Sequence, residues 1–203
     1  MTSDSSPGSS VAARGVELGW LAAVLAAAVG MFATISQIVE RIDLAENPEA
    51  SLICDINTVI SCSNVLTADQ SSAFGIPNAT IGLGVFGYVA GMAIAGLLGS
   101  VHSHRALWLL EGIALFMLGF TAWFLYQSSV NLSALCLYCL VIAVSVVVVN
   151  ATALRRLYAA GALEDGRVRR SLAGYVEAGA DLIAWLGVVV MGGMLIAIAL
   201  IFV

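Results

Sequence analysis

The sequence predicts an all-α membrane protein with five transmembrane helices. Hydrophobic residues make up 61% of the 203 residues and charged residues only 10%, with a mean hydropathy of +1.00. The surface of a soluble domain needs about a quarter charged residues, so the bilayer must be the solvent of this chain. Because a helix needs about 20 apolar residues to cross a membrane, five runs qualify: 18–39, 78–98, 107–126, 135–154 and 182–203.

The segments around the first two spans differ in composition. Residues 1–15 are rich in Ser and Gly, which predicts a disordered tail ahead of a membrane domain that covers 16–203. The first span lacks a small-residue cleavage pattern and is too long for a signal peptide, so we expect it to be retained. A polar loop over 40–77 follows. Glycines recur in the second span, which predicts a face where a neighbouring helix packs closely: Gly82, Gly84, Gly87, Gly91 and Gly96.

The arginines predict which way the spans run. Short loops keep their basic residues on the cytoplasmic side, and all 8 basic residues of this chain are arginines. They lie in the amino-terminal tail, between the second and third spans, and in the connection over 155–178, except for Arg41. We therefore expect the amino terminus in the cytoplasm. The loop over 40–77, the turn over 127–134 and the carboxyl terminus are expected on the outer side.

Four cysteines form two pairs on the expected outer side. Cys54 and Cys62, the loop pair, lie in the loop over 40–77, and Cys136 and Cys139, the C-x-x-C pair, lie where the fourth span begins. An oxidising compartment and an even count both favour disulfide pairing. Residues i and i+3 share a helix face, and the positive end of a helix favours the reactive thiolate. Cys139 lies one turn deeper, where an apolar electron acceptor would dock, and a quinone is the natural candidate.

The segment between the two loop cysteines mixes apolar and polar residues, which predicts a short amphipathic helix resting on the membrane surface. A loop that swings would meet a soluble thiol partner at one moment and the C-x-x-C pair at another, and electrons would pass through mixed disulfides. Two other interpretations stay open: disulfides that only cross-link the structure, and a zinc ion bound by the four thiolates. The wide spacing between Cys62 and Cys136 and the position of His102 and His104 in a cytoplasmic loop weaken the zinc interpretation.

Three features together make the chain resemble bacterial members of the vitamin K epoxide reductase family over nearly its whole length. They are the loop pair, Phe-Gly-Ile-Pro-Asn over 74–78 at the entry to the second span, and Cys-Leu-Tyr-Cys over 136–139. The resemblance implies a four-helix bundle around a quinone of menaquinone or ubiquinone type, plus one additional helix. It also implies that Cys139 faces the quinone, that Cys136 exchanges with the loop pair, and that the Asn78 amide lies near the quinone ring. The alternative role for Asn78 is a helix N-cap.

The function implied by the resemblance is thiol:quinone oxidoreduction in the bacterial cytoplasmic membrane, with electrons passing from the loop pair to the C-x-x-C pair and on to the quinone. Some bacterial relatives carry a fused thioredoxin-like domain after the fifth helix, whereas this chain ends at Val203. The expected partner is therefore a separate DsbA-like thioredoxin-fold protein. Ala143 stands where animal members have a tyrosine associated with vitamin K, so epoxide reduction is the secondary alternative. The DsbB family carries out the same chemistry, but there the C-x-x-C pair comes first in the sequence, ahead of the second pair, which is the reverse of the order here.

A non-catalytic membrane protein, such as a transporter with structural disulfides, is the alternative from another class. Its polar residues would mark a pathway, yet Glu111 is the only acid well inside an apolar run, and we expect it to snorkel to water near the inner end. The sequence has no basic stripe interleaved with aromatic residues, so we expect no nucleic-acid partner. Capture of a mixed disulfide would separate the two classes.

Overall fold

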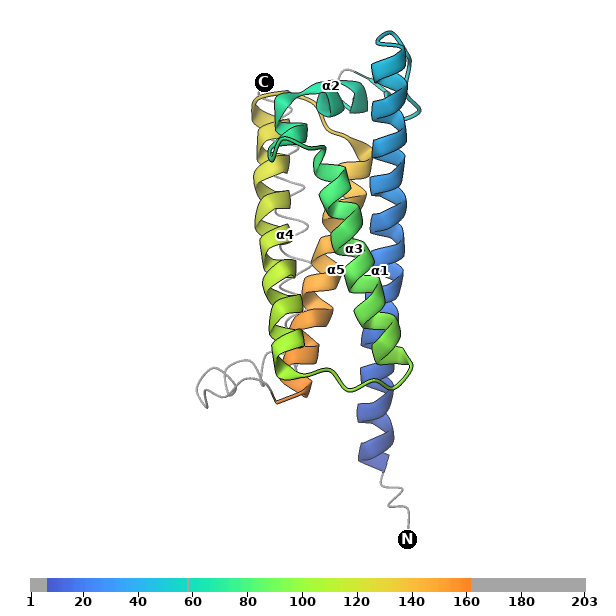
Figure 1. Ribbon diagram of the computed structural model, residues 1–203, viewed down its shortest axis with the longest axis vertical. Coiled ribbons are helices and arrows are strands. Elements are labelled where there is room, and N and C mark those ends of the chain that lie inside the picture. Colours follow the sequence, from blue (N-terminus) through green and yellow to red (C-terminus); the bar gives the residue numbers. More distant parts are fainter. Residues whose placement is uncertain (1–6, 58, 162–203) are drawn as a thin grey trace.

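The computed structural model describes residues 7–57 and 59–161, and within them the chain is helical apart from connecting turns and one isolated β-bridge. Four long helices run along a common axis, and two short ones cover one end, which we call the cysteine end (Figure 1). The prediction of an all-α fold is confirmed. The elements are α1 Pro7–Glu46, α2 Cys62–Thr67, the 3-10 helix η1 Asp69–Ser72, α3 Asn78–Leu97, α4 His104–Val130 and α5 Leu137–Ala159.

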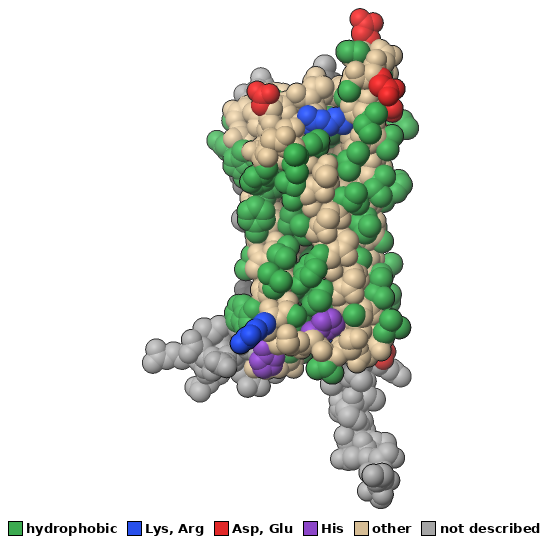
Figure 2. Space-filling view, viewed as in Figure 1, with side chains coloured by type: hydrophobic (Ala, Val, Ile, Leu, Met, Phe, Trp, Pro, Cys, Tyr) green, Lys and Arg blue, Asp and Glu red, His purple; other side chains and the backbone are tan. Residues whose placement is uncertain are grey.

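The long helices can cross a membrane. Four stretches are long and apolar enough, and they correspond to the first four expected spans: Glu17–Glu46, Asn78–Leu97, His104–Val130 and Leu137–Ala159. The fifth expected span, 182–203, lies outside the described residues. Figure 2 shows hydrophobic side chains along the flank of the bundle, acidic side chains at the cysteine end and histidines at the opposite end. The chain is a multi-pass membrane protein.

Helix α1 is longer than predicted at both ends. It begins at Pro7, so residues 7–15, expected as part of a disordered tail, are helical. It continues to Glu46, well into the predicted loop over 40–77. Side chains from other elements hold its polar last turns; Arg41, for example, donates hydrogen bonds to the two serines that end η1. These partners are distant in the sequence, so composition alone does not reveal them.

The other helices begin and end at recognisable signals. The Ser103 hydroxyl accepts a hydrogen bond from a backbone amide in the first turn of α4 and caps that helix. Glycines with positive φ follow α3 and α5, Gly99 at +87° and Gly161 at +66°, as is common at helix ends. Because α5 reaches Ala159, the start of the connection predicted over 155–178 is helical. Most of the remainder of that connection lies outside the described residues.

Small residues let α1 approach α3 closely. A Cβ on Gly30 would collide with the Phe86 ring, and one on Gly96 would collide with Trp20. Of the glycines in the second span, Gly82 and Gly96 face α1, whereas a Cβ on the other three would meet no atom of the described chain within 4 Å. The predicted packing face therefore rests on two of these glycines. α1 also packs along α5, and α4 packs on α5.

Glu111 does not snorkel to water as we expected. Only 5% of its surface is exposed, and one of its carboxylate oxygens has no hydrogen-bond partner among the described residues. Farther along α4, the buried Asn150 of α5 donates a hydrogen bond to the Ala114 carbonyl at 2.9 Å and ties the two helices together. Glu111 and Asn150 are therefore interior polar groups, and they lie away from the cysteine end.

Candidate active site

All four cysteines gather at the cysteine end of the bundle. Cys54 lies in the loop after α1, and Cys62 opens α2. Cys136 directly precedes α5, and Cys139 lies in the first turn of that helix. A disulfide joins the loop pair, whereas the C-x-x-C pair has free thiols, and all four residues are buried. The loop pair is thus oxidised and the C-x-x-C pair reduced.

A parallel β-bridge between Ile60 and Leu135 sets the two pairs side by side. The Leu135 amide donates to the carbonyl of the residue before Ile60 at 2.7 Å, and the Ser61 amide donates to the Leu135 carbonyl at 3.0 Å. Cys62 follows Ser61 and Cys136 follows Leu135, so the bridge brings the two cysteines together. Their Sγ atoms lie 3.2 Å apart. Their wide spacing in the sequence is therefore no argument against a shared site.

The described residues between the loop cysteines form an irregular loop, with the bridge at Ile60, rather than the predicted amphipathic helix. The Asn57 side chain accepts a hydrogen bond from the Ile60 amide at 2.8 Å. The Asp55 carboxylate accepts one from the Ser63 amide at 3.0 Å and one from the Leu52 amide at 3.4 Å. Burial alone would raise the pKa of Asp55, but its hydrogen bonds outweigh burial and lower it. These bonds hold the loop against the end of the bundle in this redox state.

Gln37 of α1 reaches both sulfurs of the C-x-x-C pair. Its Nε2 donates to Cys139 Sγ at 3.1 Å and lies 3.7 Å from Cys136 Sγ. A hydrogen bond from Cys139 lowers the pKa of Cys136 below the ordinary thiol value, against the opposing effect of burial. Cys136 is therefore primed to form a thiolate, and it is also the cysteine that contacts Cys62.

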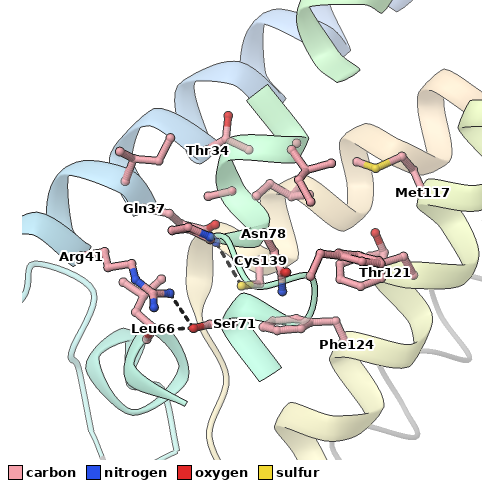
Figure 3. Close-up of a pocket in the computed structure, with 18 of the residues that line it drawn as sticks. Thr34, Gln37, Arg41, Leu66, Ser71, Asn78, Met117, Thr121, Phe124 and Cys139 are labelled. Carbon is pink, nitrogen blue, oxygen red and sulfur yellow. Dashed lines mark hydrogen bonds between the residues drawn. The ribbon is translucent and has the colours of Figure 1, made fainter. Parts of the chain in front are cut away.

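A pocket opens beside Cys139 between the four long helices (Figure 3). It encloses about 860 Å³, counting its open side. Phe120 and Phe124 of α4 form an aromatic wall together with Phe74, whose ring centroid lies 5.5 Å from that of Phe120. In Figure 3 the Cys139 thiol and the Gln37 amide point toward each other at the edge of the pocket. Such a pocket fits a flat apolar ring that carries polar carbonyl groups.

Asn78 lines the same pocket, but its side chain also holds the preceding loop. Its Nδ2 donates to the Gln70 carbonyl at 2.7 Å, and its Oδ1 accepts from the Ala73 amide at 3.1 Å. The N-cap position of α3 belongs to Pro77, so the N-cap interpretation of Asn78 is wrong. The second amide hydrogen of Asn78 is available for a ligand, and a hydrogen bond to a quinone carbonyl stays a prediction.

Arg41 links three elements over the pocket. Its Nη1 donates to Ser71 Oγ at 2.6 Å and its Nη2 to Ser72 Oγ at 2.9 Å. Ser71 Oγ in turn donates to the Leu66 carbonyl of α2 at 2.8 Å. Arg41, Ser71 and Leu66 all line the pocket, and Figure 3 shows them on one side of it. This chain of bonds fixes η1 and α2 above the pocket.

Glu40 lies beside the loop disulfide. Its Oε2 is 3.2 Å from Cys54 Sγ, and its Oε1 accepts a hydrogen bond from the Tyr138 hydroxyl at 3.1 Å. Glu40, Cys54 and Cys62 each place one possible metal-ligand atom within 4.8 Å of the other two. While the disulfide is closed, its sulfurs have no thiolate to offer a metal ion. The trio is thus not a metal centre in this redox state.

The sequence patterns do not single out three residues of this site: Gln37, Glu40 and Arg41. A polar or charged side chain in a membrane-spanning helix is costly unless it has a partner, so their place at the end of the first span was a usable signal. Only the fold shows that the partners are a thiol, a disulfide sulfur and the serines of η1.

Comparison with known proteins agrees with this geometry. A family model described as the vitamin K epoxide reductase family matches residues 21–154, which is more than half of the chain. The matched region runs from α1 into α5 and includes all four cysteines and the pocket. Among curated proteins, no match is found.

Proposed function

The chain belongs to the vitamin K epoxide reductase family, whose members are quinone-dependent disulfide oxidoreductases, and from this premise we propose that it reoxidises a separate DsbA-like thioredoxin-fold protein outside the cytoplasm. Electrons from the thiols of that partner enter at the loop pair, pass to the C-x-x-C pair and leave to a quinone of menaquinone or ubiquinone type. The net product is a new disulfide in the partner.

The contact between the two cysteine pairs is the observation that supports this relay best. Cys62 is bonded to Cys54, and its Sγ lies 3.2 Å from Cys136 Sγ. Thiol–disulfide exchange requires a thiolate to reach a disulfide sulfur, and Cys136 is the cysteine with the lowered pKa. We infer that Cys62 and Cys136 exchange with each other, which leaves Cys54 to meet the partner.

In the working direction, a partner thiolate attacks Cys54, and Cys62 leaves as a thiolate. Cys62 then attacks Cys136 of the oxidised C-x-x-C pair, and Cys139 leaves beside the pocket. The second partner thiol releases Cys54, which attacks Cys62 and frees Cys136. The partner now holds a disulfide, and its two electrons reside on the C-x-x-C thiols. This is the same redox state as that of the structure.

The pocket beside Cys139 suits a quinone by its chemistry. Aromatic side chains form an apolar wall, and Gln37 and Asn78 bring amide groups to the lining. Gln37 stabilises negative charge on the Cys139 sulfur by donating a hydrogen bond to it at 3.1 Å. When bound, a quinone supplies the acceptor for two electrons and two protons.

The charge distribution supports an orientation with the cysteine end outside the cytoplasm of a bacterial cell. Within the described residues from 17 onward, Arg41 is the one basic residue at the cysteine end, and Arg105, Arg155 and Arg156 lie at the opposite end. Because basic residues of short loops stay in the cytoplasm, we assign the opposite end to the cytoplasmic side. Disulfides also persist in the compartment that this orientation gives the cysteines.

The test is a turnover assay with the purified protein in detergent, a reduced thioredoxin-fold oxidase and a quinone. We expect the wild type to oxidise the partner and reduce the quinone in equal amounts. Cys139→Ala should do neither in the steady state, because the last thiol of the relay is missing. Without the partner, quinone reduction should stop once the protein's own thiols are used. Equal turnover in Cys139→Ala, or none in the wild type, would contradict the proposal and favour structural disulfides.

A further inference from the structure

Glu40 is a buried carboxyl group to which the relay assigns no role. It lies in the last turns of α1 with 7% of its surface exposed. Its Oε2 is 3.2 Å from Cys54 Sγ, and its Oε1 accepts a hydrogen bond from the Tyr138 hydroxyl at 3.1 Å. Tyr138 belongs to the C-x-x-C segment, so Glu40 stands between the two redox pairs.

The contact between Glu40 and Cys54 can transfer a proton only after the disulfide opens. A disulfide sulfur carries no proton, so Oε2 of Glu40 has no hydrogen bond to accept from it, and a buried carboxylate oxygen without a donor is unfavourable. After opening, Cys54 is a thiol or a thiolate. The same 3.2 Å separation is then a hydrogen-bond distance across which a proton can move.

We propose that Glu40 is the general acid and base for Cys54, taking its proton when Cys54 attacks and returning it when Cys54 leaves. The assignment rests on the proposed function, because it supplies the proton path for one step of that relay. Before the step, Cys62 is bonded to Cys136, Cys54 is a thiol and Glu40 is ionised. Afterwards, Cys62 is bonded to Cys54. Cys136 has left with the electron pair of the broken bond, and the proton of Cys54 lies on Glu40.

Other titratable groups surround Glu40. Asp43, one turn further along α1, and Asp55, in the loop, act on it through their charges, and Tyr138 of α5 donates a hydrogen bond to it. The loop pair completes its surroundings, with sulfur atoms within 4.8 Å of a Glu40 oxygen. A pH profile of the wild type alone therefore reports several groups, and the assignment needs matched variants.

The test is a single turnover that requires no partner protein. Protein with all four cysteines reduced is mixed with a soluble quinone and quenched in acid, and its disulfides are mapped by mass spectrometry after the free thiols are blocked. In the wild type, the disulfide between Cys62 and Cys136 should give way to the one between Cys54 and Cys62. In Glu40→Gln the first should accumulate, and the second should form roughly 100-fold more slowly near pH ~7, within the range of acid–base catalysis.

Two features distinguish proton transfer from a structural role. The defect of Glu40→Gln should shrink as the pH rises above ~8.5, where thiols ionise unaided, and Glu40→Asp, which keeps a carboxylate, should regain part of the rate. The first oxidation of the C-x-x-C pair by the quinone should proceed equally in every variant, which shows that the fold is intact. Glu46→Gln, the same change at an exposed position of α1, should match the wild type.

Equal rates and pH profiles in Glu40→Gln and the wild type would overturn the assignment, and so would a defect that does not change with pH. If thioredoxin-fold proteins fail to reduce the loop pair, the proposed partner is wrong, but this single turnover still decides the role of Glu40.

Discussion

At the scale of single residues, the site depends on polar side chains that α1 brings into an apolar bundle. Gln37 donates to the Cys139 sulfur, Glu40 touches Cys54, and Arg41 holds the serines of η1. A buried polar group left without a partner costs about 1–3 kcal/mol. Each of these side chains therefore has a partner for its buried polar group, and the same contact holds the neighbouring sulfur or loop in place.

Gln37→Leu should slow the reduction of quinone by the C-x-x-C pair about tenfold or more. The variant removes a hydrogen bond to the Cys139 sulfur, and such a bond to a charged group contributes about 1.5–3 kcal/mol. Rapid-mixing absorbance of the quinone measures the rate. Ile38→Leu, a volume-conserving change at a neighbouring pocket residue, is the control and should stay close to the wild type. An unchanged rate in Gln37→Leu would show that the bond does not assist the chemistry.

The Cys136 thiolate gives a pH dependence of definite sign. A hydrogen bond from Cys139 is the largest cause of the lowered pKa of Cys136, so the thiolate should persist below the ordinary thiol range and disappear as the pH falls through the lowered pKa. In Cys139→Ala that bond is lost, and the titration of Cys136 should move to higher pH. Ultraviolet absorbance of the thiolate, with the loop disulfide closed, follows the titration. A midpoint that does not move would contradict this explanation.

At the scale of elements, one β-bridge between a loop and the approach to α5 decides which cysteines meet. The bridge pairs Ile60 with Leu135, and the residues that follow are the ones whose sulfurs lie 3.2 Å apart. The long helices could be predicted from the length of the apolar runs. The bridge could not be predicted in this way. A single pair of bridged residues has no periodic pattern, and Ile60 and Leu135 lie far apart in the sequence.

Leu135→Pro should separate the two redox pairs. Proline has no amide hydrogen, so the 2.7 Å bond from position 135 to the loop is lost. We expect electron transfer between the pairs to slow about tenfold, whereas the C-x-x-C pair should still reduce quinone. Disulfide mapping after a single turnover measures both. Leu135→Ala, which keeps the amide, should behave like the wild type, and an equal defect in both variants would assign the effect to the side chain.

The bounds and packing faces of the helices depend on tertiary contacts that the sequence pattern does not reveal. The charged last turns of α1 predicted a loop from residue 40, yet the helix continues to Glu46. Arg41 donates a hydrogen bond to a serine of η1, and Glu40 accepts one from Tyr138 of α5, so these charged side chains have partners within the fold. The glycines of α3 predicted one packing face, yet two of five meet α1. In both cases tertiary contacts decided what local composition left open.

At the scale of the whole molecule, the bundle keeps two environments close together. We assign thiol exchange to the loop layer at the cysteine end, where the four cysteines pack in a buried cluster with apolar side chains such as Leu52 and Val65. The apolar pocket beneath this layer opens between the long helices. Cys139 belongs to both, since it packs in the loop layer and lines the pocket. The four cysteines and the pocket's place could be predicted from sequence order and resemblance, whereas the buried Gln37, Glu40 and Arg41 contacts required the fold.

The partner should dock on the exposed apolar residues of the cysteine end. Ile53, which precedes Cys54, is 92% exposed, and burying such a side chain is worth about 1.5–3 kcal/mol. Ile53→Asp should therefore raise the KM for the thioredoxin-fold partner roughly tenfold, without changing single turnover by quinone. Val101→Asp, at an equally exposed apolar position of the opposite end, is the control. Equal effects of the two changes would argue against docking at the cysteine end.

The most direct test of the relay is to ask which loop cysteine bonds to Cys136 in the intact membrane. With Cys54→Ala and Cys139→Ala combined, the remaining Cys62 and Cys136 should form a disulfide rapidly under mild oxidation, because their sulfurs already lie 3.2 Å apart. With Cys62→Ala and Cys139→Ala combined, Cys54 and Cys136 should stay reduced. Bonding between Cys54 and Cys136 that is as fast or faster would contradict the relay order derived from the structure.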